Sequence, residues 1–167
     1  MDLSKLSTGD KLIAGSTIGL FIFSFLPWFK VSVDGGGVFG GFEESISGWD
    51  VGFLWGRFPL FLAVLMAAYV GIKAFSPDTK LPTLPVAWGQ ALLGVGCLCA
   101  FLVILKLLLG EDLSVPGGLE GTGVEVSRSY GLFLSVIATV GLAVGGFFKM
   151  QEGDDDTSGG GAPPTTF

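Results

Sequence analysis

Apolar residues fall into four long runs along the chain, separated by stretches rich in glycine, proline and polar residues. The longest run covers residues 86–109, about 24 positions whose only strongly polar members are Gln90 and Lys106. Because an α-helix rises about 1.5 Å per residue, this run would be about 36 Å long, enough to cross a hydrocarbon core of about 30 Å. A soluble helix of that length would show a polar face. The pattern therefore predicts a transmembrane helix.

Three further runs, each of about 18 residues, are long enough to cross a membrane. They cover residues 12–29, 58–75 and 131–148. The first could instead be a signal peptide, because it follows a short basic segment, but it is long for that role and no small-residue cleavage site follows it. We therefore expect an uncleaved first helix that ends with Trp28 at the level of the lipid headgroups.

Two glycine-rich loops, residues 30–57 and 111–130, contain short stretches with the alternation of strands. Residues 30–34 and 124–127 alternate apolar and polar side chains, and residues 38–39 could begin a returning strand. We expect the two loops to pair, because several strands together are more stable than a lone hairpin. The predicted fold is an all-α membrane protein, a four-transmembrane-helix bundle with a small extracellular β-sheet formed by the two outer loops.

The charged residues divide the chain and orient it. Residues 1–149 would form the membrane domain, and residues 150–167, acidic and rich in Gly, Pro and Thr, would form a disordered cytoplasmic tail. With both termini cytoplasmic, the inner side carries Lys5, Lys11, Lys73, Lys80 and Lys149, and the outer side carries Lys30, Arg57 and Arg128. This bias favours a multi-pass plasma-membrane protein with both termini inside.

Small residues recur at intervals of four in every predicted span. Such stripes let helix backbones approach closely, which matters in lipid because apolar burial alone does not drive helices together. The predicted packing residues are Gly15, Gly19, Ala63, Ala67, Gly71, Gly96, Ala100, Gly141 and Gly145. Some of these stripes could instead face a second copy of the chain.

The segment before the second span, residues 47–57, combines aromatic residues with one arginine. It could be an interfacial anchor that leads into the helix. It could also be a contact surface for a partner, since Trp and Arg are favoured at binding hot spots. The predicted contact residues are Trp28, Trp49, Phe53, Trp55 and Arg57.

Composition and charge limit the classes of partner that the chain could bind. Half of the 167 residues are hydrophobic and 14% are charged, fewer than in a soluble domain. The net charge of −6 excludes an ordinary nucleic-acid binder, which needs a basic patch. The partners left are the lipid bilayer, other copies of the chain and other membrane proteins.

Candidate chemistry is sparse, and no catalytic residue, cofactor or metal ion is predicted. The chain has no His, which removes the commonest general base and zinc ligand. Cys97 and Cys99 are most simply small apolar residues of the central span. Lys106 lies in the last turn of that span and is expected to snorkel to water rather than act as a counter-ion. Calcium binding is an alternative to a solvated acidic surface for Glu43, Glu44, Asp50, Glu111, Asp112, Glu120 and Glu125.

Two resemblances follow from these residues. Residues 12–28, with the Gly48-Trp49-Asp50 step before the second span, resemble the small, uncharacterised four-span membrane proteins of actinobacteria, which implies no activity. The first loop, with residues 27–32, Trp49 and Gly52-Phe53-Leu54-Trp55, is similar to that of claudins. Claudins have Gly-Leu-Trp followed by two cysteines, whereas this chain has an inserted Phe53, a shorter loop and no loop cysteines. The resemblance therefore implies only a shape, four helices capped by a small outer sheet.

These patterns favour a non-enzymatic tetraspan that acts as a structural or accessory subunit through helix and outer-loop contacts. The alternative is a homo-oligomeric channel or pore, which needs polar residues along one helix face. The polar residues available for a pore are Ser16, Thr17, Gln90, Ser135 and Thr139. A membrane enzyme is disfavoured because no nucleophile–base pair or metal set is visible in the sequence.

Overall fold

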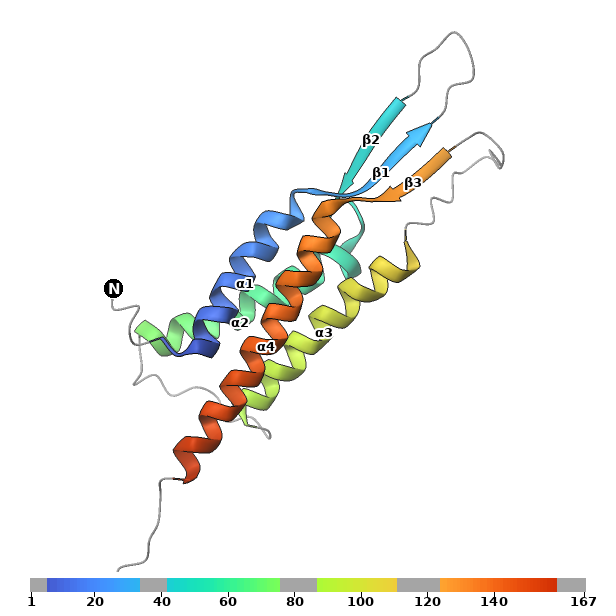
Figure 1. The fold of residues 1–167 in the computed structure, drawn as a ribbon. Helices are drawn as coiled ribbons and strands as arrows, with labels where there is room; N and C mark the ends of the chain where they lie inside the picture. The colour runs from blue at the N-terminus through green and yellow to red at the C-terminus, as the bar shows by residue number, and fades with distance from the viewer. Residues whose placement is uncertain (1–5, 34–41, 76–86, 111–123, 159–167) are drawn as a thin grey trace, which may run out of the picture.

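The computed structural model describes residues 6–33, 42–75, 87–110 and 124–158. These residues form four helices and a small antiparallel sheet (Figure 1). The elements are α1 (Thr8–Ser24), β1 (Pro27–Val33), β2 (Phe42–Ser47), the π-helical segment η2 (Phe53–Arg57), α2 (Phe58–Phe75), α3 (Trp88–Leu109), β3 (Val124–Arg128) and α4 (Tyr130–Ser158).

Three of the helices in the described ranges are long and apolar enough to cross a membrane. They are Phe53–Phe75, in which η2 continues directly into α2, Trp88–Leu109, and Tyr130–Glu152. They coincide with the second, third and fourth predicted spans. The prediction of long apolar helices, each able to cross a membrane, is therefore confirmed for these three segments.

The first helix lies earlier in the chain than predicted. α1 runs from Thr8 to Ser24 and has 17 residues, so the predicted span 12–29 is wrong at both ends. Its start is fixed by a capping box in which Ser7 Oγ accepts from the Asp10 N–H and Asp10 Oδ2 accepts from the Ser7 N–H. Its end precedes Pro27, which has no N–H and disfavours a helical residue before it. Trp28 therefore belongs to a strand and not to the helix.

The last helix extends further than predicted. α4 continues to Ser158, so the expected disordered tail is wrong for residues 150–158. Glu152 pairs with Lys149 one turn earlier and also reaches α1, and both contacts favour continuation of the helix beyond the apolar run. The rest of the predicted tail, residues 159–167, lies outside the described residues.

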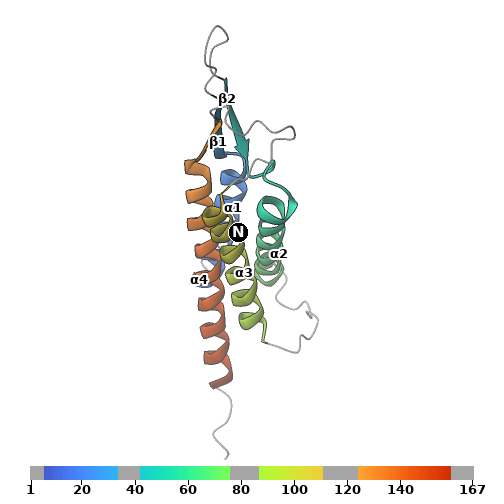
Figure 2. The ribbon, with the colours of Figure 1, turned by 90° about the vertical axis from the view of Figure 1, so that its right-hand side faces the viewer.

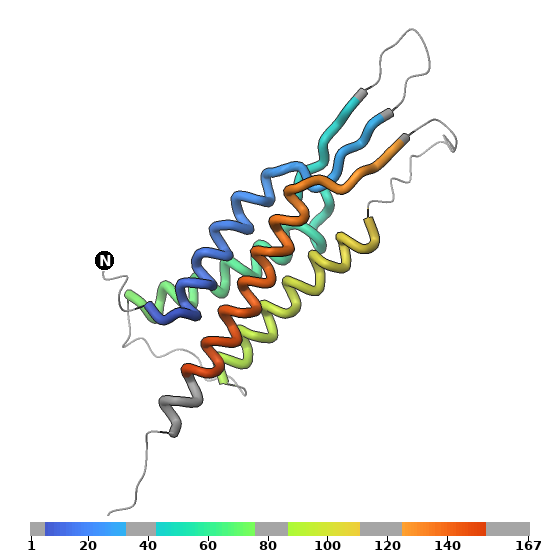
Figure 3. The backbone as a smooth tube through the Cα atoms, viewed as in Figure 1, coloured from blue at the N-terminus to red at the C-terminus, as the bar shows by residue number. Residues whose placement is uncertain are grey.

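The four helices form a bundle in which α4 and α2 lie on opposite sides of the α1 and α3 pair. α4 packs on α1 and α3, and α2 packs on the same two helices from the other side (Figure 2). The start of α1 and the end of α2 lie at the same end of the bundle as the start of α3 (Figure 3). The sheet projects from the opposite end (Figure 1). The helices therefore alternate in direction along the chain (Figure 3).

The sheet has the order β2-β1-β3, and both pairings are antiparallel. In the register, Val31 of β1 lies between Glu44 of β2 and Val126 of β3. The prediction that the two loops pair into one small sheet is confirmed. The returning strand is β2, which the sequence reading did not identify, and residues 38–39 lie outside the described residues.

Glycines set the distance between α4 and its neighbours. A Cβ added at Gly96 of α3 would lie 2.7 Å from Ala143 Cα of α4, and one at Gly146 of α4 would lie 2.7 Å from Leu93 Cα of α3. Distances under about 3 Å leave no room for a side chain, so these helices touch backbone to backbone. The α1–α4 contact is similar, because a Cβ at Gly145 would lie 2.8 Å from Ile13 Cγ1.

The predicted small residues divide into two groups. Those at packed positions are Ala63, Gly96, Ala100, Gly141, whose Cβ would meet Ser16 Oγ, and Gly145. Ala67 and Gly19 are half-buried, and a Cβ at Gly15 or Gly71 would have open space among the described residues. The packing role predicted for Gly15 and Gly71 is therefore wrong within one copy of the chain, because the buried face of α2 runs through Ala63, Met66 and Val70 instead. Gly146 of α4, which is also closely packed, was not among the predicted residues.

Candidate functional site at the sheet end of the bundle

Trp28 supports the fold and is not part of an exposed contact surface. Its side chain is 1% exposed, and its Nε1 donates to the Phe23 carbonyl at 3.1 Å. A Cβ at Gly48 would lie 2.7 Å from the Trp28 ring, so the chain passes directly over the indole. The prediction of Trp28 as a partner contact is wrong because β1 turns the side chain into the core formed with Phe29 and Val51.

The segment between β2 and α2 is built by a tight turn around Asp50. Asp50 Oδ2 accepts from the Ser47 hydroxyl at 2.6 Å and from the Ser47 N–H at 3.2 Å. These hydrogen bonds, the side-chain bond first, hold the pKa of Asp50 below its ordinary value, and the Arg57 charge adds a smaller effect. Gly52 follows with a φ of +99°, a conformation that favours glycine. The turn leads into η2 at the sheet end of α2.

Close backbone packing fixes η2 on this turn. A Cβ at Gly56 would run into the Gly48 carbonyl, so only glycine fits there. The Gly48 N–H in turn donates to the Ser24 carbonyl at 3.0 Å, which ties the segment to the end of α1. The backbone of the segment is therefore packed closely into the fold, which fixes the points from which its exposed side chains project.

Two predicted contact residues and one neighbour are exposed on this segment. Phe53 is 63% exposed and Leu54 is 49% exposed. Arg57 is also exposed, and its Nη2 donates to the Trp49 carbonyl at 2.8 Å. Trp49 is half-buried, with its ring centroid 5.5 Å from that of Phe25. The structure thus brings Trp49, Phe53 and Arg57 together, and it adds Leu54, which the sequence reading did not include.

Trp55 faces inward and contributes to an aromatic site for Lys106. Lys106 Nζ lies 5.6 Å from the centroid of Phe29 and 5.7 Å from that of Trp55, distances suited to cation–π attraction. Lys106 is 8% exposed. The expectation that it snorkels to water is therefore wrong, because aromatic rings from β1 and η2 cover the end of α3. Trp55 is half-buried, and its packing links η2 to α3.

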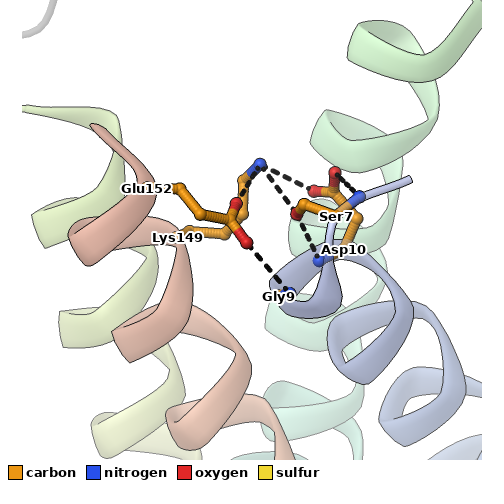
Figure 4. Close-up of polar contacts among 5 residues, drawn as sticks. All are labelled: Ser7, Gly9, Asp10, Lys149 and Glu152. Atoms are coloured by element: carbon orange, nitrogen blue, oxygen red, sulfur yellow. Dashed lines mark hydrogen bonds and ion pairs between the residues drawn. The ribbon is translucent and has the colours of Figure 1, made fainter. Parts of the chain in front are cut away.

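A second polar cluster lies at the opposite end of the bundle (Figure 4). Lys149 Nζ lies 3.0 Å from Asp10 Oδ1 and 3.1 Å from Glu152 Oε2. Glu152 Oε1 accepts from the Gly9 N–H at 3.3 Å, and Lys149 Nζ donates to Ser7 Oγ at 3.4 Å. These contacts join the start of α1 to α4. The spacing of Ser7 and Asp10 is that of a capping box and indicates a helix start, but their contact with Lys149 was not predicted.

The remaining candidates for chemistry do not form a reactive centre in the part of the chain that the structure describes. Cys97 is exposed, and Cys99 is buried with its Sγ 3.5 Å from the Pro59 carbonyl. Among the described residues, no group of three or more Cys, Asp or Glu side chains is placed to hold a metal ion. Glu111, Asp112 and Glu120 of the calcium hypothesis lie outside the described residues.

No family model, curated protein or solved structure matches this chain.

Proposed function

We propose that this chain is a four-span protein of the plasma membrane that acts as a non-enzymatic structural or accessory subunit. In this proposal it binds another membrane protein or a second copy of itself through Phe53 and Leu54. The observation that carries the proposal is the exposure of these two side chains on a segment whose backbone is fixed by close glycine contacts. Because the backbone of this segment is already ordered, it loses little conformational entropy on binding.

The packing of α1 against α4 supports a fourth span. Near one end, a Cβ at Gly9 would lie 2.9 Å from the Gly145 carbonyl, and further along α1, a Cβ at Gly19 would lie 3.9 Å from Ala138 Cβ. The two helices are thus side by side along the apolar part of α4. α1 also exposes large apolar side chains, among them Ile18 and Ile22. A helix beside a spanning helix, with apolar side chains on its outer face, fits the interior of the bilayer.

The charge pattern supports the orientation. Lys11 and Lys73 are exposed at one end of the bundle, whereas Lys30, Arg57 and Arg128 lie at the sheet end. By sequence, with Lys5, Lys80 and Lys149, five basic residues belong to the side without the sheet, against four on the sheet side once Lys106 is included. We therefore place both termini in the cytoplasm and the sheet outside.

Hydrogen bonds within the bundle favour this role over a pore. The Thr17 hydroxyl lies within hydrogen-bond distance of two carbonyl oxygens, those of Ile13 at 2.9 Å and Ala63 at 3.1 Å. Ser135 Oγ donates to the Gly131 carbonyl at 2.8 Å. Thr139 is bonded to α4 in the same way, to the Ser135 and Val136 carbonyls. These hydroxyl groups donate their hydrogen bonds to backbone carbonyls inside the bundle, whereas a pore needs polar groups that face water.

Photo-crosslinking tests the contact. A photoreactive amino acid is placed at Leu54, and a matched control is placed at Ile137, which is exposed on α4 away from the segment. In native membranes we expect a defined protein adduct from position 54 and only lipid adducts from position 137. The same lipid adducts from both positions, with no protein adduct, would overturn the proposed contact.

A further inference from the structure

A groove runs between α1 and α2, next to the segment that joins β2 to α2. It has a volume of about 500 Å³. Its lining consists of Phe21 of α1, Trp49, Phe53 and Arg57 of η2, and Leu60, Phe61 and Val64 at the start of α2. The last four residues have the spacing i, i+3, i+4 and i+7, so they lie along one face of the helix. The surface that lines the groove is almost wholly apolar, and Arg57 stands at the end of this row of residues nearest the sheet.

The apolar part of the groove is open to the surroundings of the bundle. Leu60 is buried and forms part of its floor, whereas Phe21, Phe61 and Val64 are exposed. From Arg57 to Val64 the helix rises about 10 Å, which covers roughly a third of a hydrocarbon core of about 30 Å. An apolar chain that lay along these residues would point from the sheet end toward the middle of the bilayer.

Arg57 places a positive charge at the end of the groove nearest the sheet. Its guanidinium has five N–H donors, and one donates to the Trp49 carbonyl at 2.8 Å. The nearby carboxylate of Asp50 is engaged by the Ser47 hydroxyl and N–H, and only a weaker charge interaction with Arg57 remains. The exposed guanidinium thus retains donors for a further anion, and its fork suits a phosphate.

We infer that this groove binds one anionic phospholipid of the leaflet at the sheet end. The phosphate is bound by Arg57, and one acyl chain lies over Leu60 against Phe21, Phe61 and Val64. The site suits both parts of such a lipid. Arg57 provides a positive charge at the level of the headgroup, and the apolar residues of the groove run from there in the direction that an acyl chain takes. A partner's helix would also cover the apolar residues, but it would not by itself account for the charge at the end of the groove. This inference goes beyond the proposed contact at Leu54 and does not depend on it.

Native mass spectrometry of the full-length protein tests the inference. The protein is delipidated in detergent and titrated with phosphatidylglycerol or phosphatidylcholine of the same chain length. We expect one tightly bound phosphatidylglycerol per chain, with a preference of about fivefold over phosphatidylcholine, the effect of one basic residue at a membrane surface.

Three variants locate the bound lipid. Arg57→Gln changes an exposed side chain and is expected to remove the preference, whereas Lys30→Gln, an exposed cation on β1 outside the groove, is expected to keep it. Val64→Trp fills the apolar part and is expected to weaken binding of both lipids. An unchanged preference in Arg57→Gln, or an equal loss in Lys30→Gln, would overturn the site. Equal binding of the two lipids to the unaltered protein would also overturn it, and so would a partner protein that occupies the groove in native membranes in place of lipid.

Discussion

At the scale of single residues, Lys106 shows how the surroundings can reverse an expectation drawn from sequence. A lysine in the last turn of an apolar helix usually reaches water along its flexible stem. Here β1 and η2 bring the rings of Phe29 and Trp55 to the Nζ atom, from positions far away in the sequence. The ring faces carry negative charge density and replace part of the lost hydration. The position of Lys106 in its helix was predictable, but its aromatic neighbours depend on tertiary structure.

We predict that Lys106 and Trp55 are energetically coupled. In a double-mutant cycle, Lys106→Met removes the charge at similar side-chain length and Trp55→Leu removes the aromatic ring, and the cycle cancels the packing loss of the smaller Leu. We expect a coupling free energy of about 0.5–2 kcal/mol in reversible unfolding in micelles. Additive effects of the two substitutions, within about 0.3 kcal/mol, would show that the contact does not stabilise the fold.

A second prediction at this scale concerns Asp50. Its pKa lies below the ordinary value of 3.8 because Ser47 donates two hydrogen bonds to the ionised carboxylate. The stabilisation is therefore complete above the ordinary pKa and is lost as the pH falls through the lowered pKa. Ser47→Ala removes the hydroxyl donor, so the pKa measured by NMR titration of the Asp50 carboxyl should rise. An unchanged titration would show that the Ser47 side chain does not control Asp50.

At the scale of elements, the sequence predicted the apolar runs better than it predicted their ends. The three longest helices follow the hydropathy pattern because lipid requires long, internally hydrogen-bonded segments. The end of α1 depends on Pro27, and its start depends on a capping box at Ser7 and Asp10. Glu152 was assigned to a disordered tail because its contact with Gly9 of α1 is not visible in the sequence. For the same reason the groove between α1 and α2 was not predicted.

The α3–α4 contact yields a prediction with a built-in control. Gly96→Ala would place a methyl group 2.7 Å from Ala143 Cα, so the helices must separate, at a cost of about 1–3 kcal/mol in the free energy of unfolding. Gly94→Ala on the same helix meets open space among the described residues and should leave stability unchanged or slightly raised. Both variants are compared by denaturant unfolding in micelles. Equal effects would contradict the close contact.

The polar cluster at the opposite end predicts the local stability of α1. Lys149→Met removes the ion pairs of Lys149 with Asp10 and Glu152, a change of about 1 kcal/mol for such partly exposed pairs. Amide hydrogen exchange near Gly9 should therefore become about fivefold faster. Lys11→Met, at an exposed lysine of the same helix, is the control and should have no effect. Unchanged exchange in Lys149→Met would mean that the cluster does not hold the helix.

At the scale of the whole molecule, the central claim is that α1 crosses the membrane together with the three longer helices. Four crossings place the start of α1 and the end of α2 on the same side, opposite the sheet. With only α2, α3 and α4 in the membrane, the start of α1 would lie on the same side as the sheet. The proposed accessory role, the orientation and the leaflet of the lipid site all depend on whether the chain crosses the membrane four times or three.

The most direct measurement is cysteine accessibility in intact cells. Glu43→Cys, Lys11→Cys and Lys73→Cys, each at an exposed position, are introduced singly into a chain that carries Cys97→Ser and Cys99→Ala. With a membrane-impermeant maleimide, we predict labelling at position 43 in intact cells and labelling at positions 11 and 73 only after permeabilisation. Labelling of both 43 and 11 in intact cells, with 73 protected, would show that α1 does not cross the membrane and would contradict the four-span account.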